Sequence, residues 1–158
     1  MGFFDGYNIA TSGMSAQRQR INIVSANIAN AQTTHTLDKD GNVVTAPYKK
    51  QNVLFEEVLL DQQGRAKSIN SANKEELNSL SLRGVGVQDI VPSLEPTVLK
   101  YEPNHPDANK NGYVEYPNIN PVVEMVDLIE AMRSYEANVS AFKTQKDLDT
   151  KTLDILKA

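Results

Sequence analysis

The stretch NPVVEMVDLIEAMRSYEANVSAF, residues 120–142, decides the fold because it predicts one long helix with a regular apolar edge. Asn120 supplies an N-cap, Pro121 is a favoured first helical residue, and Glu124 places a negative charge near the helix N-terminus. We expect the helix to run from Pro121 to about Lys157, which gives a length of roughly 55 Å at 1.5 Å per residue.

Apolar side chains recur along this helix in a heptad rhythm that is typical of a coiled-coil seam. They are Met125, Leu128, Met132, Tyr135, Val139 and Phe142, and Val122, Val126 and Ile129 widen the stripe at its start. Glu124, Asp127 and Glu130 are spaced three residues apart and could share a face, which raises the alternative of a carboxylate metalloenzyme. Helical carboxylate metal sites usually add a Glu-x-x-His pattern, whereas His35 and His105 both lie outside the predicted helices. We therefore expect these acids to face solvent.

Residues 1–34 predict a second helix, of about 25 residues, with a narrow apolar edge. Only Asp5, Arg18 and Arg20 carry charge in this region. Tyr7, Met14, Ile21 and Ile28 recur every seven residues, with Ala10, Gln17, Val24 and Ala31 in the complementary position. Gly13 costs about 1 kcal/mol relative to alanine, so this helix needs a partner. A single amphipathic helix on a globular core is the alternative interpretation.

The region between these helices, residues 35–118, shows short β-like runs separated by turn residues. Asp40-Gly41 predicts a hairpin, and the polar residues 62–81 predict a mobile excursion. The expected fold class is α+β, with long N- and C-terminal helices that form a coiled-coil-like pair and a small, mostly β insert. The corresponding domains are 1–34, 35–118 and 119–158.

Composition excludes several classes of function. The 16 basic and 20 acidic side chains give a net charge of -4 with no basic stripe, so we expect no nucleic-acid partner. The absence of cysteine excludes disulfides, thiolate metal sites and cysteine nucleophiles. No apolar run approaches the roughly 20 residues that span a bilayer, so we expect no membrane insertion. The N-terminus lacks the pattern of a cleavable signal peptide.

One motif resembles a calcium site. Asp107, Asn109, Asn111 and Gly112 match the first half of an EF-hand loop. The twelfth position is Asn118, where a bidentate glutamate is required. A calcium-binding interaction module that uses the 107–118 loop is therefore an alternative function, and an Asx-rich turn is the favoured interpretation. No sequence motif indicates a cofactor, a metal centre or a catalytic residue.

Three stretches resemble the flagellar basal-body rod proteins of bacteria. They are ATSGMSAQRQRINIVSANIANAQTT at 10–34, HPDANKNGYVEYPNIN at 105–120 and PVVEMVDLIEAMRSYEANVSAF at 121–142. Within the first stretch, SANIANAQT is similar to a motif shared by rod and hook proteins. The stretch at 105–120 resembles the feature that marks the proximal rod members of the family.

The resemblance implies a structural, non-catalytic subunit of the periplasmic rod, the axial drive shaft that transmits torque to the hook and filament. It implies export through the flagellar type III apparatus without signal cleavage. It also implies that the partners are other copies of the chain and neighbouring rod proteins, bound through the terminal helices. We expect the assembly interface to include Tyr7, Met14, Ile21, Val24, Asn27, Ile28, Asn30, Met125, Leu128, Met132, Tyr135, Asn138, Val139 and Phe142.

Overall fold

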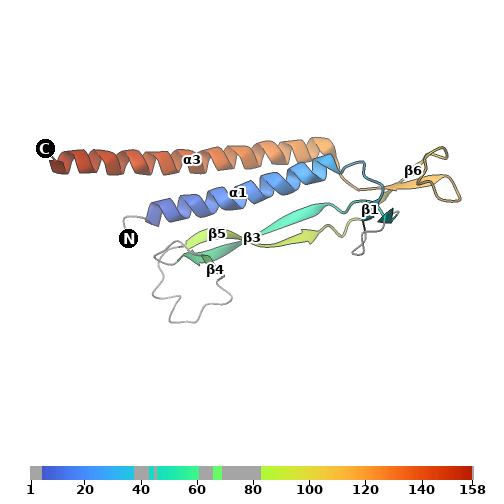
Figure 1. The fold of residues 1–158 in the computed structure, drawn as a ribbon, viewed down its shortest axis with the longest axis horizontal. Coiled ribbons are helices and arrows are strands. Elements are labelled where there is room, and N and C mark those ends of the chain that lie inside the picture. The colour runs from blue at the N-terminus through green and yellow to red at the C-terminus, as the bar shows by residue number, and fades with distance from the viewer. Residues whose placement is uncertain (1–4, 38–42, 45, 61–65, 69–82, 158) are drawn as a thin grey trace. The chain divides into compact units, whose positions relative to one another are not determined.

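In sequence, a long helix near each end of the chain encloses a set of short strands in the computed structural model, which describes residues 5–37, 43–44, 46–60, 66–68 and 83–157. The elements are α1 (Asp5–Ala29), β1 (Thr36–Leu37), β2 (Val43–Val44), β3 (Gln51–Leu60), β4 (Ala66–Ser68), β5 (Arg83–Pro92), β6 (Val98–Tyr101), β7 (Tyr113–Tyr116) and α3 (Pro121–Lys157) (Figure 1). The predicted α+β class, with terminal helices and a small β insert, is confirmed.

Helix α3 begins where the local sequence predicts. The Asn120 side-chain oxygen accepts a hydrogen bond of 3.0 Å from the backbone N–H of Val122, which is the expected N-cap. The helix extends over 37 residues to Lys157. Neither α1 nor α3 combines the length and apolar character that crossing a lipid bilayer requires.

The strands form three small sheets. β1 pairs antiparallel with β2, with Thr36 opposite Val44, and the tip of this expected hairpin, at 40–41, lies outside the described residues. β3 is the centre of a three-stranded sheet of order β4-β3-β5, and β6 pairs antiparallel with β7. Strand β4 lies within the expected 62–81 excursion and pairs antiparallel with β3. The remainder of that excursion lies outside the described residues.

Contacts divide the chain into two compact units. The first comprises Met1–Ile21, Val53–Asp89 and Ile129–Ala158, and the second comprises Asn22–Asn52 and Ile90–Leu128. Each terminal helix therefore contributes one part to each unit.

The core of the first unit lies at the end of β3, where Val58, Leu59 and Leu60 are all buried. Gly84 of β5 permits close packing here, because a Cβ at this position would lie 2.7 Å from both Leu60 Cδ1 and Ser12 Oγ. Ser12 Oγ also accepts a hydrogen bond from the backbone N–H of Val85. Helix α1 thus packs directly on β5 through a small side chain.

In the second unit, the β6–β7 pair is closed by an Asx-type turn. Asn109 Oδ1 accepts hydrogen bonds from the backbone N–H groups of Asn111 (2.9 Å) and Tyr113 (3.0 Å). Gly112 adopts a positive φ of 80°, a conformation that glycine tolerates best. This turn places Val114 in a fully buried position on β7.

Candidate assembly surface

In the first unit, α1 and α3 run antiparallel and approach closely over small residues (Figure 1). A Cβ at Gly13 would lie 2.9 Å from Asn138 Nδ2, and one at Gly6 would lie 3.4 Å from Gln145 Oε1. Seven residues separate the two glycines, and seven separate their partners, as expected for a heptad seam. The glycines therefore let the helices approach at positions where polar side chains of α3 point inward.

Side chains at two positions of a heptad face inward along α3, and only three of these eight side chains belong to the apolar stripe that the sequence predicts. The eight are Glu124, Leu128, Ala131, Tyr135, Asn138, Phe142, Gln145 and Asp149, all buried or half-buried, and Asp127, Ser134 and Val139 beside them are also half-buried. Leu128, Tyr135 and Phe142 belong to the predicted stripe. The other inward position of the heptad holds Glu124, Ala131 and Asn138. Each lies one residue before a predicted one, namely Met125, Met132 and Val139. As a result, small or polar side chains occupy five of these eight positions.

A buried polar junction fixes the end of α1 in the second unit. Asn27 is 1% exposed, and its side-chain amide bonds both the N–H and the C=O of Gln51. Asn27 Oδ1 accepts from Gln51 N, and Asn27 Nδ2 donates to Gln51 O, each at 2.9 Å. The Tyr48 hydroxyl donates to the same Oδ1 at 3.1 Å. Asn27, which belongs to α1, thus bonds both backbone polar groups of Gln51, the first residue of β3.

Glu124 completes this junction, so the expectation that it faces solvent is wrong. Its side chain is buried, and Lys50 Nζ lies 2.7 Å from Oε1 in an ion pair. Oε2 accepts a hydrogen bond of 3.1 Å from Asn27 Nδ2. Burial, and secondarily the Glu124 charge, raise the pKa of the Tyr48 hydroxyl. A buried carboxylate needs such partners, and Lys50 is far away in sequence.

Apolar side chains cover the outward side of α3 over its first half. We name this set the outer apolar face: Val122, Val123, Met125, Val126, Ile129 and Met132, which are 47% to 68% exposed. Only Met125 and Met132 are among the predicted interface residues. The others were expected to widen the inward stripe or were not singled out, because sequence periodicity does not distinguish an apolar edge that packs within the chain from one that faces outward.

The remaining predicted interface residues are partly or fully covered within the chain. Tyr7 packs edge-on against Phe142, with ring centroids 4.9 Å apart. Asn30 donates to the Ala26 carbonyl and so closes the end of α1. Val24 and Asn27 are buried, whereas Met14, Ile21, Ile28, Asn30, Leu128, Tyr135, Asn138, Val139 and Phe142 are half-buried.

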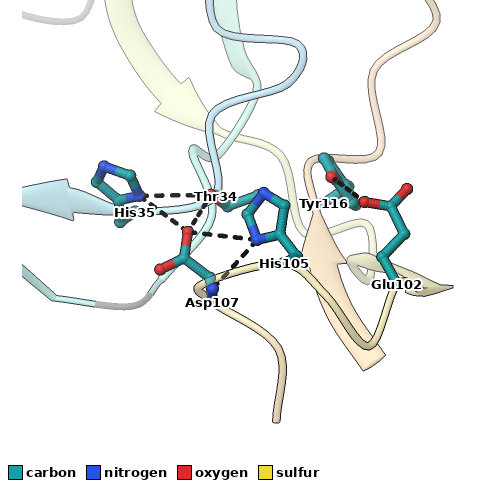
Figure 2. Close-up of polar contacts among 6 residues, drawn as sticks. All are labelled: Thr34, His35, Glu102, His105, Asp107 and Tyr116. Carbon is teal, nitrogen blue, oxygen red and sulfur yellow. Dashed lines mark hydrogen bonds and ion pairs between the residues drawn. The ribbon is translucent and has the colours of Figure 1, made fainter. Parts of the chain in front are cut away.

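Both histidines of the chain flank one carboxylate in the second unit (Figure 2). Asp107 Oδ2 accepts a hydrogen bond of 2.6 Å from the Thr34 hydroxyl and lies 3.1 Å from His35 Nδ1. His105 Nδ1 accepts from the Asp107 backbone N–H. The hydrogen bonds from Thr34 and then His35 hold the pKa of Asp107 below its ordinary range. The cluster ties the segment after α1 to the loop before β7.

This geometry counts against the calcium alternative. Of the candidate ligands, Asp107 is held by Thr34 and His35, and the Asn109 oxygen accepts two backbone N–H groups. Within the part of the chain that the structure describes, no group of three His, Asp or Glu side chains is arranged to hold a metal ion. The 107–118 loop is instead organised by internal hydrogen bonds.

We expect the contribution of the Tyr7 hydroxyl to the stability of the fold to change at alkaline pH. A hydrogen bond of 2.6 Å to Asp149, followed by burial and the nearby acidic charges, raises the pKa of Tyr7 from 10.0 to about 12. A tyrosine whose pKa is higher in the folded than in the unfolded state stabilises the fold, and this stabilisation is fully present below the unfolded-state pKa. The stabilisation is lost as the pH rises through the folded-state pKa. Tyr7→Phe should therefore be destabilising by a constant amount up to pH 10, with the difference shrinking toward pH 12.

Urea denaturation of both proteins across this range measures the effect, and Tyr135→Phe on α3 provides the matched control. A difference that stayed constant up to pH 12 would show that the Tyr7–Asp149 hydrogen bond does not shift the titration.

Two family profiles match the ends of the chain. Residues 8–34 match the family described as flagella basal body rod protein. Residues 110–155 match the family described as flagellar basal body rod FlgEFG protein C-terminal. These ranges include most of α1, all of β7 and nearly all of α3, the elements that carry the helix pair.

Curated relatives extend the similarity over nearly the whole chain. The flagellar basal-body rod protein FlgC of Borreliella burgdorferi is 38% identical over 99% of each chain. FlgC of Bacillus subtilis is 36% identical over 99% of this chain and 100% of the relative. FlgC of Buchnera aphidicola subsp. Schizaphis graminum is 39% identical over 98% of each chain. With the paired terminal helices, this full-length similarity shows that the chain belongs to the FlgC family of flagellar basal-body rod proteins.

Proposed function

We propose that this structural subunit of the proximal rod polymerises through α1 and α3, and that neighbouring rod subunits cover its outer apolar face. The observation that carries this proposal is the exposure of six large apolar side chains along one helix. Contiguous exposed apolar patches mark interaction sites in soluble proteins. In a family of rod proteins, the occupant of such a patch is a neighbouring subunit.

The energetics favour contact with helices of other subunits. Complete burial of a Val, Ile or Met side chain is worth about 1.5–3 kcal/mol, and each of these six is already about half covered. Burial of all six therefore contributes roughly 5–8 kcal/mol per subunit before the cost of association. Repeated along a polymer, this contribution offsets a large part of the cost of association, which is about 4–15 kcal/mol for each contact.

The outward side of α1 complements this apolar face. Its exposed residues include Thr11, Ser15, Asn22, Ser25 and Ala29, which are small and uncharged, and Arg18, which lies among them. The small residues permit close approach of a neighbouring helix, and the charge of Arg18 would have to stay in water or find an acidic partner on the neighbour. We infer that α1 of one subunit receives apolar side chains of α3 from another copy, or from another rod protein.

The same proposal covers location and chemistry. We infer that the subunit lies in the periplasmic part of the basal body, and that the flagellar type III apparatus exports it without cleavage of a signal peptide. We also infer that the chain is not an enzyme, because its full-length relatives are rod proteins.

Val126→Asp tests the proposal. Val126 is 60% exposed in the single chain, so the substitution should change the free energy of unfolding by no more than about 0.5 kcal/mol. In an assembled rod it would bury an unpaired carboxylate at a cost of several kcal/mol per subunit. We expect stable monomer but no rods and no motility in cells that carry only the variant.

Asn104→Asp is the matched control, because it adds the same carboxylate at an exposed turn of the second unit. It should fold, assemble and support motility. Full motility with Val126→Asp would overturn the assignment of the outer apolar face to assembly.

A further inference from the structure

The first two turns of α3 have an unusual rotation about the helix axis. Between Pro121 and Ile129 only Glu124 and Asp127 are charged, and most of the other positions carry large apolar side chains. A helix of this composition should bury an apolar side and expose its charges. The structure shows the reverse, because Glu124 is 1% exposed while Val122 is 68% exposed. Hydrophobic burial alone therefore does not select this rotation.

Helix geometry relates the buried acid to the exposed valines. At about 100° per residue, Val122 and Val126 each lie roughly 160° from Glu124, on the opposite side of the helix. Val123 and Met125 lie about 100° away on the two flanks. An inward Glu124 consequently turns all four apolar side chains outward. A rotation of the helix by roughly 100° toward Val123 would bury Val123 and bring Val126 to within about 60° of the inward direction.

The contacts that hold Glu124 inward are specific and come from two separate segments. Lys50 Nζ lies 2.7 Å from Oε1, and Asn27 Nδ2 donates to Oε2 at 3.1 Å. Asn27 is itself fixed by its two hydrogen bonds to the Gln51 backbone. Buried ion pairs often contribute less stability than apolar residues of similar size, but a buried polar group can select one arrangement among several.

We propose that Glu124 is a positioning residue: its buried pairing with Lys50 and Asn27 sets the rotation of the start of α3 and keeps Val122 and Val126 outward. The use of those side chains in assembly rests on the proposed function. The rotation itself is a property of the single chain and is measurable without any partner.

Cysteine labelling measures the rotation directly, because the natural chain has no cysteine. Val126→Cys provides one thiol on the outward side of α3. We expect it to react rapidly with a maleimide in the otherwise natural chain. In the double variant Glu124→Ser/Lys50→Met, which leaves neither an ion pair nor an apolar side chain at the inward position, we expect the helix to rotate toward burial of its apolar side, which should slow labelling by about tenfold or more through local protection.

Two further variants make the test specific. Glu130→Ser/Lys49→Met makes the same chemical changes at exposed positions and should label at the natural rate. Glu124→Gln/Lys50→Met removes both charges but keeps an acceptor for Asn27, so it should restore rapid labelling. Circular dichroism reports whether α3 is still helical in each protein.

Labelling of the Glu124→Ser/Lys50→Met variant at the natural rate, with its helix retained, would overturn the proposal. Loss of helicity in that variant would also count against it, since the pair would then be required for the helix rather than for its rotation. Slow labelling after Glu124→Gln/Lys50→Met would contradict positioning through Asn27. Slow labelling of the serine variant with normal motility would support the positioning role and overturn the proposed use of the outer apolar face.

Discussion

Asn27→Ala is expected to lower the free energy of unfolding by about 3–5 kcal/mol, which is a large fraction of the stability of a small domain. The side chain is almost completely buried and bonds both the N–H and the C=O of Gln51. Its removal also leaves Glu124 Oε2 without this donor. Each buried polar group that loses its partner costs about 1–3 kcal/mol. Urea denaturation monitored by circular dichroism measures the loss.

Asn30→Ala is the matched control, because Asn30 is the same residue type, three positions later. Its amide donates to the Ala26 carbonyl at the end of α1, and the residue is only half-buried. We expect a cost below about 1 kcal/mol, as is typical of a partly exposed hydrogen bond. Equal losses for the two substitutions would mean that the hydrogen bonds of Asn27 are not a main source of stability.

The parts of the fold that local chemistry determines could be predicted from the sequence. The start of α3 follows from Asn120 and Pro121, whose capping and backbone preferences need no distant partner. The heptad period of α3 was also visible, and Leu128, Tyr135 and Phe142 face inward as the period predicts. Long helices with strong end signals are therefore the reliable part of such a prediction.

The inward face of α3 could not be predicted in full, because its chemistry depends on residues far away in the chain. Glu124 is buried only because Lys50 and Asn27 are brought to it by the fold. Asn138 is inward because α1 presents Gly13, which leaves room for an amide. Periodicity reports which positions share a face, but the choice between a polar and an apolar side for burial is tertiary information.

The polar cluster at Asp107 shows the same limitation. The sequence placed Asp107 in a loop with calcium-like spacing, and the expected Asx-rich turn is present at Asn109. The contacts of Asp107 with Thr34 and His35 join segments more than seventy residues apart. No local pattern marks such a pair, so the role of Asp107 in tying the loop to the end of α1 was missed.

Lys50→Met is expected to cost about 3 kcal/mol, because it leaves the buried Glu124 carboxylate without its cation. Loss of one partner of a buried ion pair typically costs 3–5 kcal/mol, and the lower end applies here since the Lys50 side chain is 26% exposed. Glu124→Leu alone leaves the Lys50 ammonium group without its partner, but water can still reach that group. This substitution should therefore lower the free energy of unfolding by less than Lys50→Met. The double variant Glu124→Leu/Lys50→Met should lie within about 1 kcal/mol of the natural chain, because apolar replacement of a buried pair is often close to neutral.

The cycle of these variants separates the pair from its surroundings. If Lys50 acted mainly through its aliphatic stem, the two substitutions would add and the double variant would be the least stable. If the charge pairing dominates, the second substitution relieves the first, which gives a coupling free energy of about 2 kcal/mol or more. Lys49→Met, at an exposed neighbour, should be neutral within about 0.5 kcal/mol. An additive cycle would therefore reject the ion pair as the feature that makes burial of Glu124 tolerable, even if the geometry of the junction is correct.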